Sequence, residues 1–206
     1  MKKSVTCFII VVMMLCLASG CGTDYAKDEY VELKIDKSYK EETPEPAFPD
    51  EFAREYWFSS GVGGWRTYLN LKADGSFDGQ HTDSDMGVSG DGYVATQYIC
   101  NFSGKFEFVE KIDSNSYKVV LKELTMENAE GEEWIEDEVC YIAVNAYGIS
   151  GGEEFILYTP DTPTAGLSDE FISWWPKGMG YAPEEQPDTL TQYAIYNIST
   201  GEGFFS

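Results

Sequence analysis

Residues 65–81 read WRTYLNLKADGSFDGQH, and this stretch decides the fold class. Thr67, Leu69 and Leu71 fall on one face of an extended strand, because successive side chains of a strand point to opposite faces. The dipeptide Asp74-Gly75 follows, which is among the strongest local signals for a tight β-hairpin turn. Residues 76–81 then begin a return strand. The stretch therefore predicts an antiparallel hairpin.

The same kind of pattern continues toward the end of the chain. Short alternating runs separated by Gly, Asn and Asp predict further strands at residues 97–111, 117–124, 134–144, 154–158 and 190–198. Gly104 lies in the middle of the longest run, where a bulge or bend is expected. One short helix is predicted over residues 167–176, with Ser168 as N-cap and Pro176 as terminator. The fold class is therefore all-β, with roughly eight strands.

About eight strands in succession must avoid exposing a long unpaired edge. Closure into an antiparallel barrel removes that edge, and an eight-stranded barrel can hold one small ligand inside. A two-sheet β-sandwich is the alternative, because alternation of side chains does not distinguish the two architectures.

The N-terminus has the features of a secretory signal. A basic start (MKK) precedes an apolar run over residues 5–17, which is too short to span a membrane. Residues 17–21, LASGC, resemble the bacterial lipobox, in which the cysteine is diacylated and becomes the first mature residue. The resemblance implies a signal peptide over residues 1–20 and attachment of acyl chains such as palmitate to Cys21. A plain signal peptide with a chance cysteine is the alternative.

The mature chain divides into a tether and a domain. Residues 21–51 are rich in charges of both signs and end in the Pro-containing run TPEPAFPD, so we expect a flexible segment. A coil of roughly thirty residues spans about 30 Å, which is enough to hold a domain clear of a membrane surface. Residues 52–206 contain the predicted strands and form the barrel domain.

Net charge excludes several classes of partner. The chain carries 36 acidic and 14 Lys or Arg residues, for a net charge of −22. Such a surface repels phosphate backbones and anionic lipids, so binding to nucleic acid or to a membrane through basic residues is not expected. Aromatic content of 15%, with five Trp, is enough for a packed core, so most of the chain should fold.

Three stretches carry a resemblance to a known group of proteins. Residues 61–69 (GVGGWRTYL), 74–79 (DGSFDG) and 98–106 (YICNFSGKF) resemble uncharacterised lipocalin-like lipoproteins from Gram-positive gut bacteria. The resemblance implies a lipocalin-like barrel held by lipid on the extracytoplasmic face of the cell membrane, and no particular activity. Gly63-Gly64-Trp65 also fits the short Gly-x-Trp signature of lipocalins, whose Trp plugs the closed end of the barrel.

Cys100 and Cys140 remain once the signal peptide and Cys21 are set aside. A disulfide between them is one alternative in an extracytoplasmic protein. In a simple meander their strands would flank the strand at 117–124 and lie about 9–10 Å apart, beyond the roughly 7 Å that a disulfide tolerates. Two buried reduced thiols are the other alternative, which this spacing favours.

No catalytic signature is present, so we do not predict an enzyme. His81 is the only histidine, and the Gly-x-Ser-x-Gly motif of serine hydrolases is absent. We interpret His81 as an exposed polar residue at a strand end, and the alternative is a metal site in which it joins oxygen ligands from the nearby Asp83 and Asp85.

Asp83, Asp85 and Asp91 have the spacing of three acids in a calcium-binding loop. The sixth position is Val88 instead of Gly, and the twelfth is Val94 instead of an acid, so the EF-hand pattern fails. An irregular calcium site that uses the three acids is one interpretation, and a solvated polar loop is the other.

Trp174 and Trp175 on the predicted helix, with Tyr181 after it, form the most suggestive aromatic group. Adjacent helical residues point about 100° apart, so only one Trp is expected to pack on the barrel. The other could stack on a sugar ring or line a barrel mouth together with Tyr181. The alternative is that the helix caps the end of the barrel.

These observations lead to two functional hypotheses. The first is a lipid-anchored binding protein whose barrel holds a small molecule or engages another component of the envelope. The second is a structural or inhibitory interaction protein with a solid barrel, whose acidic exterior meets a cationic partner. An open aromatic interior would favour the first hypothesis, and a filled interior would favour the second.

Overall fold

The computed structural model describes residues 47–61, 63–175 and 187–206. The predicted signal peptide, Cys21, Tyr181 and most of the predicted tether lie outside these residues. The described chain begins with a 3-10 turn, η1 (Asp50–Phe52), and Phe52 is fully buried. Phe48 also packs against the core, so the domain includes the last part of the predicted tether.

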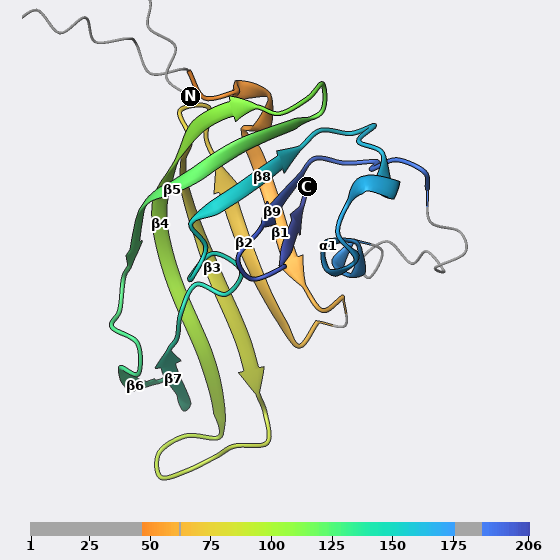
Figure 1. Ribbon diagram of the computed structural model, residues 1–206. Helices are drawn as coiled ribbons and strands as arrows, with labels where there is room; N and C mark the ends of the chain where they lie inside the picture. The colour runs from red at the N-terminus through yellow and green to blue at the C-terminus, as the bar shows by residue number, and fades with distance from the viewer. Residues whose placement is uncertain (1–46, 62, 176–186) are drawn as a thin grey trace, which may run out of the picture. The chain divides into compact units, whose positions relative to one another are not determined.

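Eight strands form a closed antiparallel barrel (Figure 1). Their bounds are β1 (Arg54–Ser59), β2 (Trp65–Leu71), β3 (Ser76–Asp85), β4 (Ala95–Lys111), β5 (Ser116–Met126), β8 (Glu154–Tyr158), β9 (Ala194–Asn197) and β10 (Gly203–Phe205). The order around the ring is β3, β2, β1, β10, β9, β8, β5, β4, and pairing of β3 with β4 closes it. The predicted all-β barrel of about eight strands is therefore confirmed, with the hairpin at Asp74-Gly75 joining β2 to β3.

The strand β4 is the longest, with 17 residues, and its neighbours change along its length. Residues 102–111 pair with β5, whereas residues 95–99 pair in parallel with β7 (Val139–Ala143). β6 (Glu133–Glu136) pairs with β7 at the outer edge. Because β5 ends at Met126, the first part of β4 would otherwise leave backbone groups unpaired, and β7 satisfies them. Figure 1 shows β3 and β4 extending past the other barrel strands, with β6 and β7 beside β4.

The single strand predicted over residues 134–144 is wrong. A turn at Asp137 and Glu138, which both have positive φ (48° and 62°), divides this run into β6 and β7. Positive φ at both central residues is typical of a type I′ hairpin turn, which usually contains Asn or Gly. Asp137 is also tolerated in this conformation, but Glu138 is not typical of it and no Gly follows, so the turn sequence carries only a weak signal.

Aromatic side chains of the strands fill the barrel, and two glycines make room for them. Phe77 lies opposite Gly104, and Phe102 lies opposite Gly79, in the ladder between β3 and β4. A Cβ atom on Gly104 would clash with the Phe77 ring and with the carbonyl oxygen of Glu123. The register of β4 against β5 shifts between Lys105 and Phe106, and the extra residue is Lys122 on β5, so the bulge predicted at Gly104 is found next to it on the neighbouring strand. Each glycine thus allows one ring to lie flat across the neighbouring strand.

The helix α1 (Asp169–Trp174) packs on the outer wall of the barrel (Figure 1). The Ser168 hydroxyl accepts a hydrogen bond from the backbone N–H of Phe171 (3.2 Å), so the predicted N-cap forms. Phe171 is fully buried and contacts the rings of Tyr158, Tyr196 and Phe205 on β8, β9 and β10. The main body of the helix therefore covers three strands from the outside and does not cap the barrel end.

Candidate functional site

The inside of the barrel is a packed core. Phe106 contacts Phe77 and Phe155, with ring centroids 4.7 and 4.9 Å apart. Ala146 and Ile149, from the segment between β7 and β8, are fully buried in the same cluster. Since side chains of the protein occupy the interior, the arrangement favours a solid barrel over one that holds a ligand inside.

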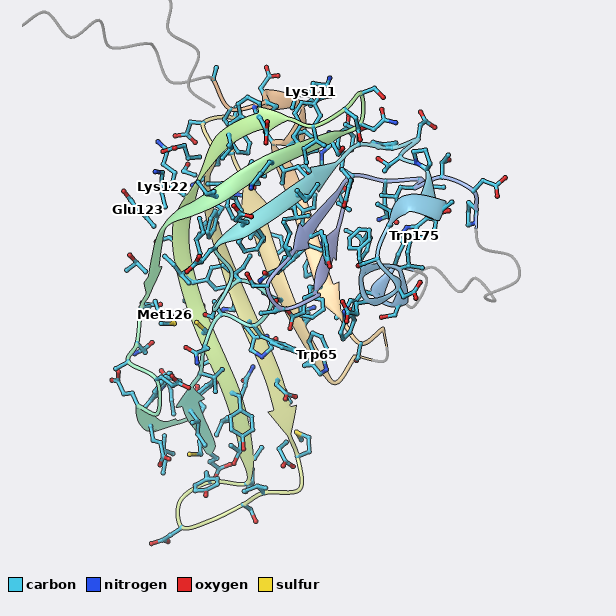
Figure 2. All side chains as sticks on the ribbon, in the orientation of Figure 1. Trp65, Lys111, Lys122, Glu123, Met126 and Trp175 are labelled. Atoms are coloured by element: carbon cyan, nitrogen blue, oxygen red, sulfur yellow. The ribbon has the colours of Figure 1, made fainter. Side chains whose placement is uncertain are left out.

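Aromatic rings around Trp65 plug the end of the barrel from which β3 and β4 extend (Figure 2). Trp65 contacts Phe58 (4.8 Å between centroids), Tyr147 (4.9 Å) and Trp174 (6.0 Å). A Trp in this place is what the Gly-x-Trp resemblance implies. Trp174 of α1 therefore reaches the rim of the barrel, although the helix itself lies on the wall.

His81 faces the interior near this plug, so its interpretation as an exposed residue is wrong. Its side chain is only 6% exposed because it lies on the same face of β3 as Phe77. The Thr67 hydroxyl donates to the carbonyl oxygen of Tyr147 (2.9 Å) and lies 2.9 Å from Nδ1 of His81. With the hydroxyl proton already used, Nδ1 must donate to Thr67 Oγ1. Burial lowers the pKa of His81, so the imidazole is kept neutral.

The most distinctive hollow lies outside the barrel, next to the loop that joins β1 to β2. It encloses about 560 Å³, and we call it the Trp57 cleft. Its lining residues are Trp57, Ser59, Gly61, Gly63, Gly64, Trp65, Arg66, Thr82, Ser84 and Gln97. A Cβ atom on Gly63 or Gly64 would meet nothing within 4 Å, so the loop leaves the cleft open to solvent. Among the residues that the structure describes, no Asp or Glu lines the cleft, although the chain has 36 acidic residues.

Trp57 and Arg66 are the prominent side chains of the Trp57 cleft. Trp57 is 42% exposed and contacts the Tyr68 ring, with centroids 4.8 Å apart. The Arg66 guanidinium lies 5.6 Å from the centroid of the Trp57 ring, which is within the range of a cation–π contact. Among the described residues, no carboxylate lies within ion-pair distance of Arg66. The cleft therefore combines an exposed indole with a positive charge that no carboxylate neutralises.

A smaller hollow of about 190 Å³ lies beside the Trp57 cleft, and Trp57 and Ser59 line both. We call it the Trp175 hollow, because Trp174 and Trp175 line it together with Phe205. Trp175 is only 1% exposed and lies beside α1 outside the barrel (Figure 2). The expectation that only one of the two Trp packs on the barrel is wrong, because Trp174 packs against the core and Trp175 is buried in the cluster on the outer wall. Both line the hollow, while Tyr181 lies outside the described residues.

The predicted calcium ligands are not brought together. Asp83 and Asp85 lie on β3, whereas Asp91 lies in the loop between β3 and β4, inside the bridge of Gly90 with Tyr93. The Asp85 carboxylate accepts a hydrogen bond from the backbone N–H of Gly87 (2.9 Å). Within the described ranges, the structure contains no group of three or more side chains that could hold a metal ion.

Cys100 and Cys140 are both free and buried. The expected flanking of the strand at 117–124 is wrong, because β7 pairs directly with β4. In that ladder Cys140 lies opposite Thr96, which places it about 13 Å along the strand from Cys100. This offset is too long for a disulfide. Burial also raises the pKa of the Cys100 thiol to about 11, so it stays protonated and unreactive.

Sequence reasoning missed Trp57 and Arg66. A signal was present in the run Tyr56-Trp57-Phe58, because strand alternation forces the middle ring outward when the outer two face the core. Arg66 approaches Trp57 only through the register of β1 with β2, which pairs Ser59 with Arg66 and Trp57 with Tyr68. This diagonal neighbour relationship cannot be obtained from one strand alone.

Comparison of the chain with protein-family models, curated proteins and solved structures finds no match.

Proposed function

We propose that this protein is a lipid-anchored extracytoplasmic binding protein that recognises a component of the cell envelope on the outside of its barrel. The observation that carries this proposal is the contrast between a filled interior and an exposed Trp57 in an open cleft. Buried Trp side chains stabilise a fold, whereas an exposed Trp in a concave site is typical of ligand contact.

The anchor is proposed from the N-terminal sequence. Cys21 follows the residues of a lipobox-like segment, and two acyl chains on one cysteine would hold the protein stably at a membrane, at about 0.8 kcal/mol for each buried methylene. Mass spectrometry of the mature N-terminus tests this step. A diacylated Cys21 is expected, and an unmodified cysteine would refute the anchor without affecting the Trp57 cleft.

Recognition at the Trp57 cleft suits a polar ligand that contains a ring. Trp57 offers a flat apolar surface, and Thr82, Ser84 and Gln97 offer hydroxyl and amide groups beside it. A sugar has the matching combination of a C–H face and a rim of hydroxyl groups. Components of a bacterial envelope that fit this description are its saccharides.

Co-sedimentation tests the proposal. The full-length protein, purified in mild detergent, would be mixed with insoluble envelope fragments of the producing cells and centrifuged. We expect the wild type to sediment with the fragments and Trp57→Ala to stay in solution. Trp134→Ala is the matched control, because Trp134 is a half-buried Trp that stacks on Tyr141 and does not line the cleft. Equal sedimentation of all three proteins would reject the cleft as the recognition site.

A second candidate function is contact of a solid barrel with a cationic partner. It is favoured by the distal extension, which we define as residues 84–97 together with β6 and β7. Its apolar side chains Met86, Val94 and Ile135 are more than half exposed, and its sequence contains Asp and Glu but no Lys or Arg. Envelope binding that survives Trp57→Ala but is lost at high salt would support this candidate over the first.

A further inference from the structure

We infer that the Trp57 cleft takes a carboxylated saccharide, whose ring stacks on the Trp57 indole and whose carboxylate pairs with Arg66. The inference rests on the proposed function and adds the chemical class of the ligand. Three observations carry it: the placement of the indole, the charge of the lining and the set of unused polar groups.

The indole of Trp57 is held in place before any ligand arrives. Its contact with Tyr68 supports it from the neighbouring strand β2, and the Tyr68 hydroxyl donates to the Glu55 carboxylate (3.0 Å). Because Trp57 lies on a strand that is paired on both sides, its backbone cannot shift to bury the ring. A ring fixed in this way loses little conformational entropy when a ligand stacks on it.

The charge of the lining selects for an anion. The arginines of the chain are Arg54 and Arg66, and they have different surroundings. Arg54 lies 3.4 Å from the centroid of the Tyr193 ring and donates to the backbone carbonyl of Glu51 (2.6 Å), so it is used in packing. Arg66 is exposed and lies in a cleft that no Asp or Glu of the described ranges lines. An arginine presents a planar set of donors that matches a carboxylate.

Polar groups that could bind sugar hydroxyls surround the arginine. In the strand register Arg66 lies opposite Thr82, and Ser84 lies opposite Gln97. Among the described residues, the side chains of Thr82, Ser84 and Gln97 make no hydrogen bond to the protein. Three side chains with free donors and acceptors on one wall are therefore available to a ligand.

The positions of the two hollows determine how an extended ligand would lie on the protein. Trp57 and Ser59 line both the Trp57 cleft and the Trp175 hollow, and the other described residues that line the hollow are Trp174, Trp175, Gln192, Gly203, Phe205 and Ser206. In a hexuronate the carboxylate projects outward from the edge of the ring. A ring stacked on Trp57 can thus direct its carboxylate toward Arg66 while the next ring enters the Trp175 hollow. The ligand is accordingly an oligosaccharide of at least two rings with an acidic residue at Trp57.

A glycan array with matched pairs tests the inference. It would carry oligosaccharides of hexuronates and sialic acids, each beside its methyl ester or neutral counterpart, and sulfated glycans as a separate set. The full-length protein in mild detergent should bind at least one carboxylated glycan roughly 10-fold or more above its ester, the range expected of a charge-assisted hydrogen bond. Arg66→Gln should remove this preference while weak binding to the ester remains. Trp57→Ala should lose both, and Trp134→Ala should bind as the wild type does.

Each other outcome has a defined meaning. Equal binding of acids and esters, unchanged in Arg66→Gln, would overturn the inference and leave the proposed function standing if envelope co-sedimentation still depends on Trp57. A preference for sulfated over carboxylated glycans would overturn the carboxylate assignment. Failure to bind any glycan on the array would overturn the ligand class, and co-sedimentation would then decide separately whether the proposed function survives.

Discussion

The closed barrel and the distal extension share β3 and β4 but differ in what surrounds these strands. In the barrel, Phe77 on β3 and Phe106 on β4 are 2% and 1% exposed. In the distal extension, the loop between the same strands exposes 79% of Met86 and 65% of Val94. The ladder of hydrogen bonds continues without interruption from one region into the other. Backbone pairing therefore sets the length of a strand, whereas closure of the barrel determines where a core forms.

The largest effect expected from this comparison comes from truncating a core ring. Phe106→Ala should lower the free energy of unfolding by about 3–5 kcal/mol, because it leaves a cavity among packed aromatic rings. Ile135→Ala in the distal extension is the matched control, and it should change stability by less than about 1 kcal/mol because Ile135 is 53% exposed. Urea unfolding followed by Trp fluorescence measures both. Equal losses would mean that the extension has a core of its own.

A smaller loss is expected when a methyl group is added where a ring packs on a glycine. Gly104→Ala should cost about 1–3 kcal/mol, because the new Cβ meets the Phe77 ring and the carbonyl oxygen of Glu123. Gly64→Ala should be nearly neutral, since its Cβ would meet nothing within 4 Å. Thermal unfolding of both variants checks the difference. A neutral Gly104→Ala would show that β3 and β4 separate more easily than their ladder implies.

The pH dependence of stability should report on the plug at the rim of the barrel. Burial lowers the pKa of His81 from its ordinary value of 6.5, so the unfolded chain takes up a proton at a higher pH than the folded chain does. The resulting stabilisation is fully present above about pH 6.5 and is lost as the pH falls toward the folded-state pKa. Urea unfolding between pH 7 and pH 5.5 should therefore show falling stability in the wild type and a flatter profile in His81→Asn. Trp134→Ala should keep the wild-type profile, and a decline that persists in His81→Asn would assign the effect to another group.

The smallest effect on stability is expected at the tip of the distal extension. Met86→Ser combined with Val94→Ser should leave the free energy of unfolding within about 0.5 kcal/mol of the wild-type value, because both side chains are mostly in solvent. The same variant should reduce self-association at high protein concentration, measured by analytical ultracentrifugation. Val109→Ser, on the barrel wall, is the control with an exposed apolar residue elsewhere. A large loss of stability in the double variant would contradict the division into two regions.

Most strands of the barrel can be predicted from the sequence, because core-facing and solvent-facing side chains alternate along each of them. Leu69, Leu71 and Phe106 alternate with solvent-facing residues, so their direction toward the core can be predicted before any pairing is known. The parallel contact of β7 with β4 has no such local cause. It depends on β5 ending at Met126 and leaving an edge of β4 free, which is a property of the assembled sheet.

The candidate site was harder to predict for the same reason. Trp174 and Trp175 stand out as neighbours in sequence, but neither lines the Trp57 cleft: both line the Trp175 hollow, and Trp174 also packs on Trp65 at the rim of the barrel. Trp57 and Arg66 become neighbours through the register of β1 with β2. Thr82, Ser84 and Gln97 lie beside them only because β3 pairs with β2 and β4 pairs with β3. A cleft on the outside of a barrel is built from residues that are polar in each strand, so hydrophobic periodicity does not mark it.

The pairing of β1 with β10 also constrains the order of folding. Trp57 in the first strand lies opposite Phe205 in the last one, so this contact joins nearly the two ends of the described chain. Contacts with such a large sequence separation form late, because the entropy of closing the loop must be overcome first. Until residues 203–205 have emerged and folded, β1 and β9 each keep an open edge, and a nascent chain in that state can pair with other chains. The same event fixes the wall that carries Trp57, so we expect binding competence to appear only with the last step of folding.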